Sequence, residues 1–161
     1  MQTTVDFSML NRQLEALLDT RDWLTNSAQT GAFIAQQLND LNWVGFYLQR
    51  QSNVLSLGPF QGQPACHPIP FSKGVCGAAA RQQTAQRVDD VHAVEDHIAC
   101  DANSRSELVV PVVANGHLWG VLDLDSPLHG RFTQQDQDGI EALVATFIQQ
   151  TDLPNFIAKA N

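Results

Sequence analysis

The sequence of 161 residues is poor in basic side chains, in cysteine and in long apolar runs. Nine lysines and arginines face 17 aspartates and glutamates, which gives a formal net charge of −8 at pH 7. Because phosphate groups attract clustered lysine and arginine, this balance argues against nucleic acid or an anionic membrane as a partner. No apolar run approaches the roughly 18 residues that a membrane-spanning helix needs. Residues 1–6 also lack the basic and apolar regions of a secretion signal, so we expect a cytoplasmic protein.

Only three cysteines occur, Cys66, Cys76 and Cys100. A secreted disulfide scaffold would carry an even number at a much higher density. Free cysteine is usually a core residue, but each of these lies in a segment rich in glycine, proline or polar residues. A zinc site could combine Cys100 with His97 and with Cys66, yet structural zinc sites show two closely spaced pairs and only one exists here. We therefore expect no metal.

Periodic patterns predict one domain over residues 1–161, with helices at both ends and strands between them. Apolar residues at helical spacing predict helices at 7–21, 27–38, 74–83 and 133–150. Alternating or continuous apolar runs predict strands at 43–48, 54–57, 106–113 and 117–125. The segments 58–76 and 91–105 are irregular, and loops of this length inside a compact domain are usually functional.

The last two predicted strands flank a turn that contains Asn115 and Gly116. A two-residue turn would place Leu108 opposite Asp123, whereas a three-residue loop keeps one face of the hairpin entirely apolar. Because burial of one face sets the register of a strand pair, we expect the three-residue loop. This register places Glu107 directly opposite Asp123.

The other face of the hairpin collects three acids, Glu107, Asp123 and Asp125. Gathered carboxylates repel one another unless a cation or protons join them. A solvated sheet face is the ordinary alternative, but Trp119 and Val121 share this face and indicate that it is partly covered. The pattern therefore leaves two interpretations open, a cation-binding or acid role and a solvated sheet face.

A redox role suits the thiols better than a structural metal. A reactive thiol needs solvent access and a lowered pKa, and a resolving thiol must be able to reach it. Cys100 lies in a polar loop near Arg105, and Cys66 lies in a loop broken by prolines. Cys76 follows Gly74 at the expected start of a helix, where the helix dipole favours a thiolate. Nearby carboxylates would oppose ionisation of Cys100 unless an ammonium group or a proton neutralised them.

Seven segments resemble the free methionine-(R)-sulfoxide reductases, which are single GAF-domain enzymes. They include Phe71-Ser-Lys-Gly-Val-Cys-Gly77, His97-Ile-Ala-Cys-Asp101 and Gly120-Val-Leu-Asp-Leu-Asp-Ser126, and the others lie at 42–48, 57–66, 90–92 and 104–111. The resemblance implies an α+β, GAF-like fold with a central antiparallel sheet flanked by N- and C-terminal helices. It also implies reduction of free, rather than protein-bound, methionine (R)-S-oxide.

The resemblance assigns roles to the three cysteines. Cys100 matches the catalytic cysteine, whose thiolate attacks the sulfoxide sulfur and becomes a sulfenic acid as methionine leaves. Cys66 matches the resolving cysteine, which implies a Cys66–Cys100 disulfide that thioredoxin reduces. Cys76 matches a further family cysteine with a role in resolution or recycling.

The resemblance also assigns the substrate pocket. Glu107, Asp123 and Asp125 match the acids that hold the substrate's ammonium group and assist protonation of the sulfoxide oxygen. Trp43 and Tyr47 are expected to wall the pocket around the methyl and methylene groups. No cofactor is implied, the partners are free methionine sulfoxide and thioredoxin, and a homodimer is common among GAF domains.

Two other functions are compatible with parts of the sequence. A non-catalytic GAF module would sense a small ligand or the redox state, and it usually carries an effector domain, for which 161 residues leave no room. Three thiols placed in loops argue against it, because a binding pocket needs none. The other alternative is a structural zinc or interaction domain, which a metal analysis would identify.

Overall fold

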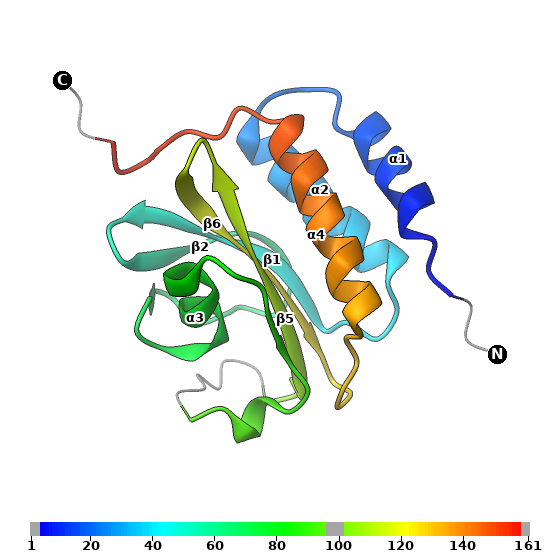
Figure 1. The fold of residues 1–161 in the computed structure, drawn as a ribbon, viewed down its shortest axis with the longest axis vertical. Coiled ribbons are helices and arrows are strands. Elements are labelled where there is room, and N and C mark those ends of the chain that lie inside the picture. The colour runs from blue at the N-terminus through cyan, green and yellow to red at the C-terminus, as the bar shows by residue number, and fades with distance from the viewer. Residues whose placement is uncertain (1–3, 96–101, 159–161) are drawn as a thin grey trace.

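The computed structural model describes residues 4–95 and 102–158, and there a six-stranded antiparallel sheet lies between helices on its two faces (Figure 1). The strands are β1 (Trp43–Gln51), β2 (Val54–Gly62), β3 (Ile69–Pro70), β4 (Gln86–Val88), β5 (Ser106–Ala114) and β6 (His117–Ser126). Their order in the sheet is β3-β2-β1-β6-β5-β4. This arrangement confirms the expected α+β fold with a central antiparallel sheet.

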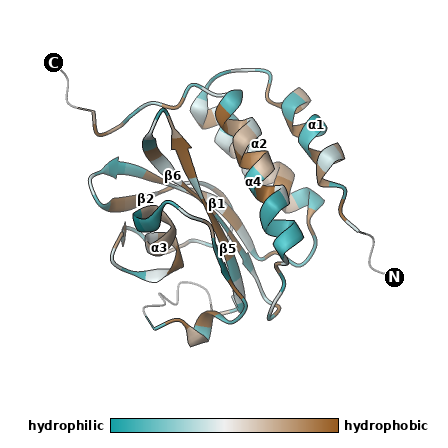
Figure 2. Ribbon diagram, viewed as in Figure 1, coloured by the Kyte–Doolittle hydropathy of each residue, from teal (hydrophilic) through white to brown (hydrophobic). Residues whose placement is uncertain are grey.

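The helices divide unequally between the two faces of the sheet. Three of them lie on one side of the sheet: α2 (Trp23–Gln37) and α4 (Gln134–Gln149) pack against it, and α1 (Phe7–Leu17) packs against α4 (Figure 1). The opposite face carries α3 (Gly74–Gln82), and a 3₁₀ helix, η1 (Val91–Ala93), follows β4. Much of the central strands is brown, and therefore hydrophobic, in Figure 2, as expected for a sheet that is covered on both sides. No helix in these parts of the chain is both long and apolar enough to cross a membrane.

Capping side chains set the helix boundaries. Thr133 and Asp136 form the reciprocal capping box that begins α4, with N···O distances of 3.1 and 2.9 Å. The second helix begins at Trp23 instead of residue 27, because Asp22 caps it by accepting from the backbone N–H of Thr25. The first helix ends at Leu17 instead of residue 21, and residues 18–22 connect it to α2.

The register of the β5–β6 hairpin differs from the expected one. Ala114 pairs with His117 across a two-residue turn, whose central residues both have positive φ as a type I′ turn requires. A register shift between Val112 and Val113 then moves the pairing along β6. The expected position of Glu107 opposite Asp123 is therefore wrong: Glu107 pairs with Asp125.

This shift leaves most side chains of the β5–β6 hairpin on the face of the sheet that the sequence predicts. From residue 106 to residue 112 of β5, the pairing with β6 is displaced from the expected register by an even number of positions. Because side chains alternate between the two faces of a strand, an even displacement leaves each of these residues on the expected face. Leu118 and Trp119, which lie at the irregularity, exchange faces: Leu118 packs on the side of α3 and Trp119 packs among the helices. All three acids remain on the side of α3.

The irregular segment after β2 is shorter than expected. The second strand continues to Gly62 because a register shift opposite Phe46 accommodates Pro59, and the short β3 pairs only with Val54 and Leu55. The loop therefore starts at residue 63 and reaches β3 at Ile69.

Candidate functional site

A cleft opens on the face of the sheet that carries α3. Its empty volume, which includes the open solvent at its mouth, is about 600 Å³. Six of the eight predicted site residues line it: Trp43, Tyr47, Cys76, Glu107, Asp123 and Asp125. The structure thus brings together residues from β1, α3, β5 and β6.

The floor of the cleft holds the three acids. Glu107 and Asp125 face each other across β5 and β6, and Asp123 lies two residues before Asp125 on the same face. Glu107 is 8% exposed and Asp123 is 5% exposed, whereas Asp125 is half-buried. The side chain of Glu107 lies close to those of Asp123 and Asp125.

Burial is the main cause that raises the pKa of both Glu107 and Asp123 well above the usual carboxyl range. Repulsion adds to it, from Asp123 on Glu107 and from Asp125 on Asp123. At least one of these two carboxyls can therefore stay protonated at a pH at which an exposed carboxyl is ionised. In addition, Asp123 Oδ1 is buried and has no hydrogen-bond partner in the described structure.

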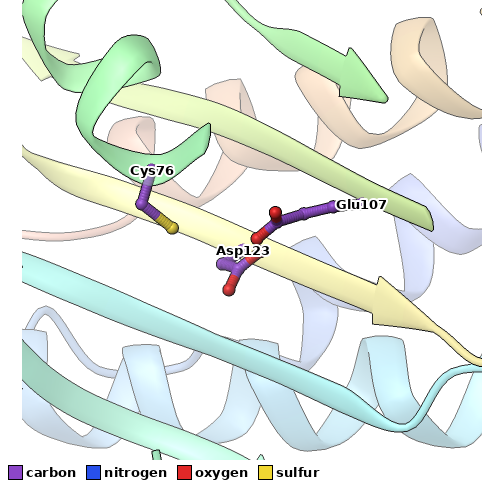
Figure 3. Close-up of side chains that lie close together, drawn as sticks. All are labelled: Cys76, Glu107 and Asp123. Atoms are coloured by element: carbon purple, nitrogen blue, oxygen red, sulfur yellow. The ribbon is translucent and has the colours of Figure 1, made fainter. Parts of the chain in front are cut away.

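Cys76 points from α3 toward these acids (Figure 3). It is a free, buried thiol, and its Sγ lies within 4.8 Å of carboxylate oxygens of Glu107 and Asp123. Burial first, and then the charges of Asp123 and Glu107, raise the pKa of this thiol well above its usual value. The expected stabilisation of a thiolate by the helix N-terminus is therefore wrong, because desolvation and three carboxylates outweigh the dipole.

Aromatic rings form one wall of the cleft. Trp43 stacks on Tyr47 with a centroid distance of 5.6 Å and on Phe60 with a centroid distance of 5.2 Å. Gly45 lies between Trp43 and Tyr47 on the strand, and a Cβ there would collide with Phe60 and with the Trp43 ring. The glycine therefore allows the rings to lie together, as the predicted apolar wall requires.

The loop that carries Cys66 is fixed to the sheet. The Trp43 indole donates to the carbonyl of Gln63 at 3.1 Å, and the Tyr47 hydroxyl donates to the carbonyl of Cys66 at 3.2 Å. The backbone N–H of Leu57 donates to Nδ1 of His67 at 3.0 Å. Cys66 is disulfide-bonded, and its neighbour Ala65 lines the cleft.

The predicted catalytic residue, Cys100, lies outside the described residues, as does the predicted pairing of Cys66 with it. The described residues on either side of residues 96–101 lie close to each other, and one of them lines the cleft. Val91 donates its backbone N–H to the carbonyl of Arg105 at 2.8 Å, so the two ends of the intervening segment lie together. Ser104, four residues after Cys100, lines the cleft.

Ser104 is a lining residue that sequence analysis missed. It is 6% exposed and accepts a hydrogen bond of 3.1 Å from the amide of Asn42. Gln63 was also missed, although it lines the cleft and its carbonyl anchors the loop. A serine before a strand and a carbonyl in a loop carry no distinctive pattern, so the only signal was that both residues lie in motif segments, Gln63 within 57–66 and Ser104 at the start of 104–111.

The comparisons with known proteins identify the family of this chain. The GAF domain family matches residues 24–150. The free methionine-R-sulfoxide reductase of Escherichia coli (strain K12) is 44% identical over 162 residues, which cover 98% of each chain. The structure of fRMsr of Staphylococcus aureus in complex with substrate has a TM-score of 0.87 at 41% identity, covering 93% of this chain and 98% of that chain.

A second solved structure gives the same result. The free methionine-R-sulfoxide reductase from Neisseria meningitidis, in complex with its substrate, has a TM-score of 0.86 at 38% identity and covers 93% of each chain. The likeness thus extends far beyond the motif segments that first indicated it. This chain is an enzyme of the GAF-domain family of free methionine-R-sulfoxide reductases.

Proposed function

We propose that residues 1–161 form one catalytic domain that reduces free L-methionine (R)-S-oxide to L-methionine. The observation that carries the proposal is the cleft in which buried Glu107 and Asp123 lie beside the stacked Trp43 and Tyr47. The similarity to the Escherichia coli reductase over 98% of both chains supports it.

The acids supply the reason for preferring a free amino acid. Free methionine sulfoxide carries an ammonium group, which neutralises gathered carboxylates and can donate to the unpartnered Oδ1 of Asp123. A methionine sulfoxide within a protein has no ammonium group, so it would leave these buried acids unpaired. Sites that leave buried polar groups unpaired can reject a substrate by a factor of about 10⁴. The rings of Trp43 and Tyr47 contact the methyl and methylene groups.

Cys100 is proposed as the nucleophile. Its thiolate attacks the sulfoxide sulfur while a protonated acid of the Glu107–Asp123 pair donates a proton to the sulfoxide oxygen. The oxygen is transferred to the cysteine, so methionine sulfur is reduced by two electrons and Cys100 is oxidised to a sulfenic acid. Four residues of extended chain reach at most about 14 Å, so the segment before Ser104 is long enough to bring the thiol to the cleft.

Cys66 is proposed as the resolving cysteine. Its thiol attacks the sulfenic acid, a Cys66–Cys100 disulfide forms and water leaves. The dithiol of thioredoxin then reduces this disulfide by thiol–disulfide exchange. Reduced thiols persist in the cytosol, which is therefore the proposed compartment. The role of Cys76 in resolution or recycling and the homodimer stay predictions.

The test is methionine formation from the free R and S sulfoxides by reduced protein, with thioredoxin, thioredoxin reductase and NADPH. Turnover of the R form by wild type, and none by Cys100→Ser, is expected. Absence of turnover in folded, reduced protein would contradict the proposal and favour a ligand or redox sensor. Near-normal turnover by Cys100→Ser would remove Cys100 as the nucleophile.

A further inference from the structure

We propose that Cys76, Glu107 and Asp123 bind a divalent metal ion of the zinc type, and that this ion and the substrate's ammonium group exclude each other. The metal site follows from the geometry of the free cleft. Its competition with substrate rests on the proposed function. No role in turnover is assigned to the metal, which acts as an inhibitor of the reductase.

The three side chains come from different elements and converge on one point (Figure 3). Sγ of Cys76 on α3, a carboxylate oxygen of Glu107 on β5 and one of Asp123 on β6 all lie within 4.8 Å of one another. Zinc ligands in a tetrahedral site are separated by about 3.5 Å, given Zn–S and Zn–O bonds of roughly 2.3 and 2.0 Å. Small side-chain rotations would therefore close the three atoms around an ion.

A second observation indicates that this site can accept a further group. Asp123 is 5% exposed, and its Oδ1 has no hydrogen-bond partner in the described structure. Buried carboxylate oxygens are normally satisfied by a donor or a cation, because leaving one unpaired costs free energy. An ion held beside Oδ1 would satisfy this oxygen.

The donor set selects the kind of ion. A thiolate favours Zn²⁺ or Co²⁺ over Mg²⁺ and Ca²⁺, which prefer oxygen ligands alone. The metal replaces the protons that the buried thiol and carboxyls hold, so binding releases protons and strengthens as the pH rises. An ion in this place would occupy the region into which the ammonium group of a free amino acid is proposed to enter.

The test uses Co²⁺, whose bond to a thiolate gives a near-ultraviolet charge-transfer band. In the Cys66→Ser/Cys100→Ser variant, Cys76 is the only cysteine left, so a band in that variant reports this thiol alone. We expect one equivalent of Co²⁺ with the band, its loss on adding Cys76→Ser, and affinity lowered about 10-fold or more by Glu107→Gln or Asp123→Asn. Glu141→Gln, an exposed acid on α4, is the matched control and should change nothing.

Competition is tested by titrating the cobalt-loaded chain with free L-methionine and with N-acetyl-L-methionine. Free methionine should displace the ion, and the acetylated form should not. Circular dichroism confirms that each variant is folded, and reduced wild type is titrated in parallel. A folded chain without the band overturns the metal site, and a band that free methionine leaves unchanged overturns the shared position. Reductase activity, measured with a chelator present, tests the proposed function separately.

Discussion

The hydroxyl of Tyr47 donates a hydrogen bond of 3.2 Å to the backbone carbonyl of Cys66. The bond joins a buried residue of the central strand to the loop that carries the predicted resolving cysteine. Burial, assisted by the charge of Asp123, raises the pKa of this phenol, so the hydroxyl stays protonated and remains a donor. One residue of the aromatic wall thus also positions Cys66.

Tyr47→Phe should therefore slow the resolving step more than the attack on substrate. Loss of one hydrogen bond costs about 1 kcal/mol, and the ring that is proposed to contact the substrate is kept. We expect kcat to fall, kcat/KM for the sulfoxide to stay nearly constant, and the sulfenic acid to live longer in a trapping assay read by mass spectrometry. Trp43→Phe, which removes the bond to Gln63 further from Cys66, is a comparison variant with a smaller expected effect. An unchanged sulfenic acid lifetime in Tyr47→Phe would refute the positioning role.

Cys76 should react slowly with iodoacetamide in the folded, reduced protein. Its thiol is 5% exposed, and its pKa is raised, so little of it is thiolate at neutral pH. Peptide mapping should show Cys66 labelled before Cys76, and the rate at Cys76 should keep rising at a pH where an ordinary thiol has levelled off. Unfolded protein supplies the control in which the two label alike. Equally fast labelling in the folded chain would contradict the burial and revive Cys76 as the first resolving thiol.

Glu107→Gln should change stability and activity in opposite directions. The pKa of Glu107 is raised in the folded state, so between its unfolded and folded values the folded chain binds the extra proton. Stability is then lost as the pH rises through that window, and the neutral amide should flatten this decline. At the same time kcat/KM should fall on the order of 10²-fold, because the partner of the ammonium group is weakened.

Urea unfolding at about pH 5 and about pH 8 measures how the free energy of unfolding changes with pH. Glu141→Gln, at an exposed position, is the control. If wild type is equally stable at both values, or if Glu107→Gln loses stability only at the higher one, the assigned direction of the pKa shift is wrong.

Gly45→Ala should destabilise the sheet. A Cβ at this position meets Cβ of Phe60 and the ring of Trp43, so the stacked rings must move. We expect a loss of about 1–3 kcal/mol in the free energy of unfolding. Gly31→Ala on α2 is the contrasting variant, because its Cβ would lie at an ordinary contact distance of 3.8 Å from the carbonyl oxygen of Val44, and alanine favours a helix by about 0.5–1 kcal/mol. Similar effects of both variants would show that the close approach at Gly45 is unimportant.

The sequence predicted most of the fold because its strands and helices are strongly periodic. The error in the hairpin arose because the Asn115–Gly116 turn and the apolar faces give conflicting registers. The protein resolves the conflict with an irregularity at Val112 and Val113, a tertiary adjustment that no local pattern encodes. The start of α2 was missed because its buried side includes polar residues, Asn26 and Ser27 among them.

Six of the eight residues that the sequence predicts for the site line the cleft, but their electrostatics could not be predicted. Cys76 and Asp123 are far apart in sequence, so nothing local showed that the thiol would lie against the acids. Only the position of Cys76 near a helix start was visible, and it indicated a lowered pKa. Burial, which depends on how α3 packs on β5 and β6, reverses that direction.

The most direct test of the central claim compares kcat/KM for free L-methionine (R)-S-oxide with kcat/KM for its N-acetyl derivative. Recognition of the ammonium group by Glu107 and Asp123 predicts a preference for the free amino acid on the order of 10⁴. Comparable values for the two substrates would contradict it, because the buried acids would then have no part in choosing the substrate.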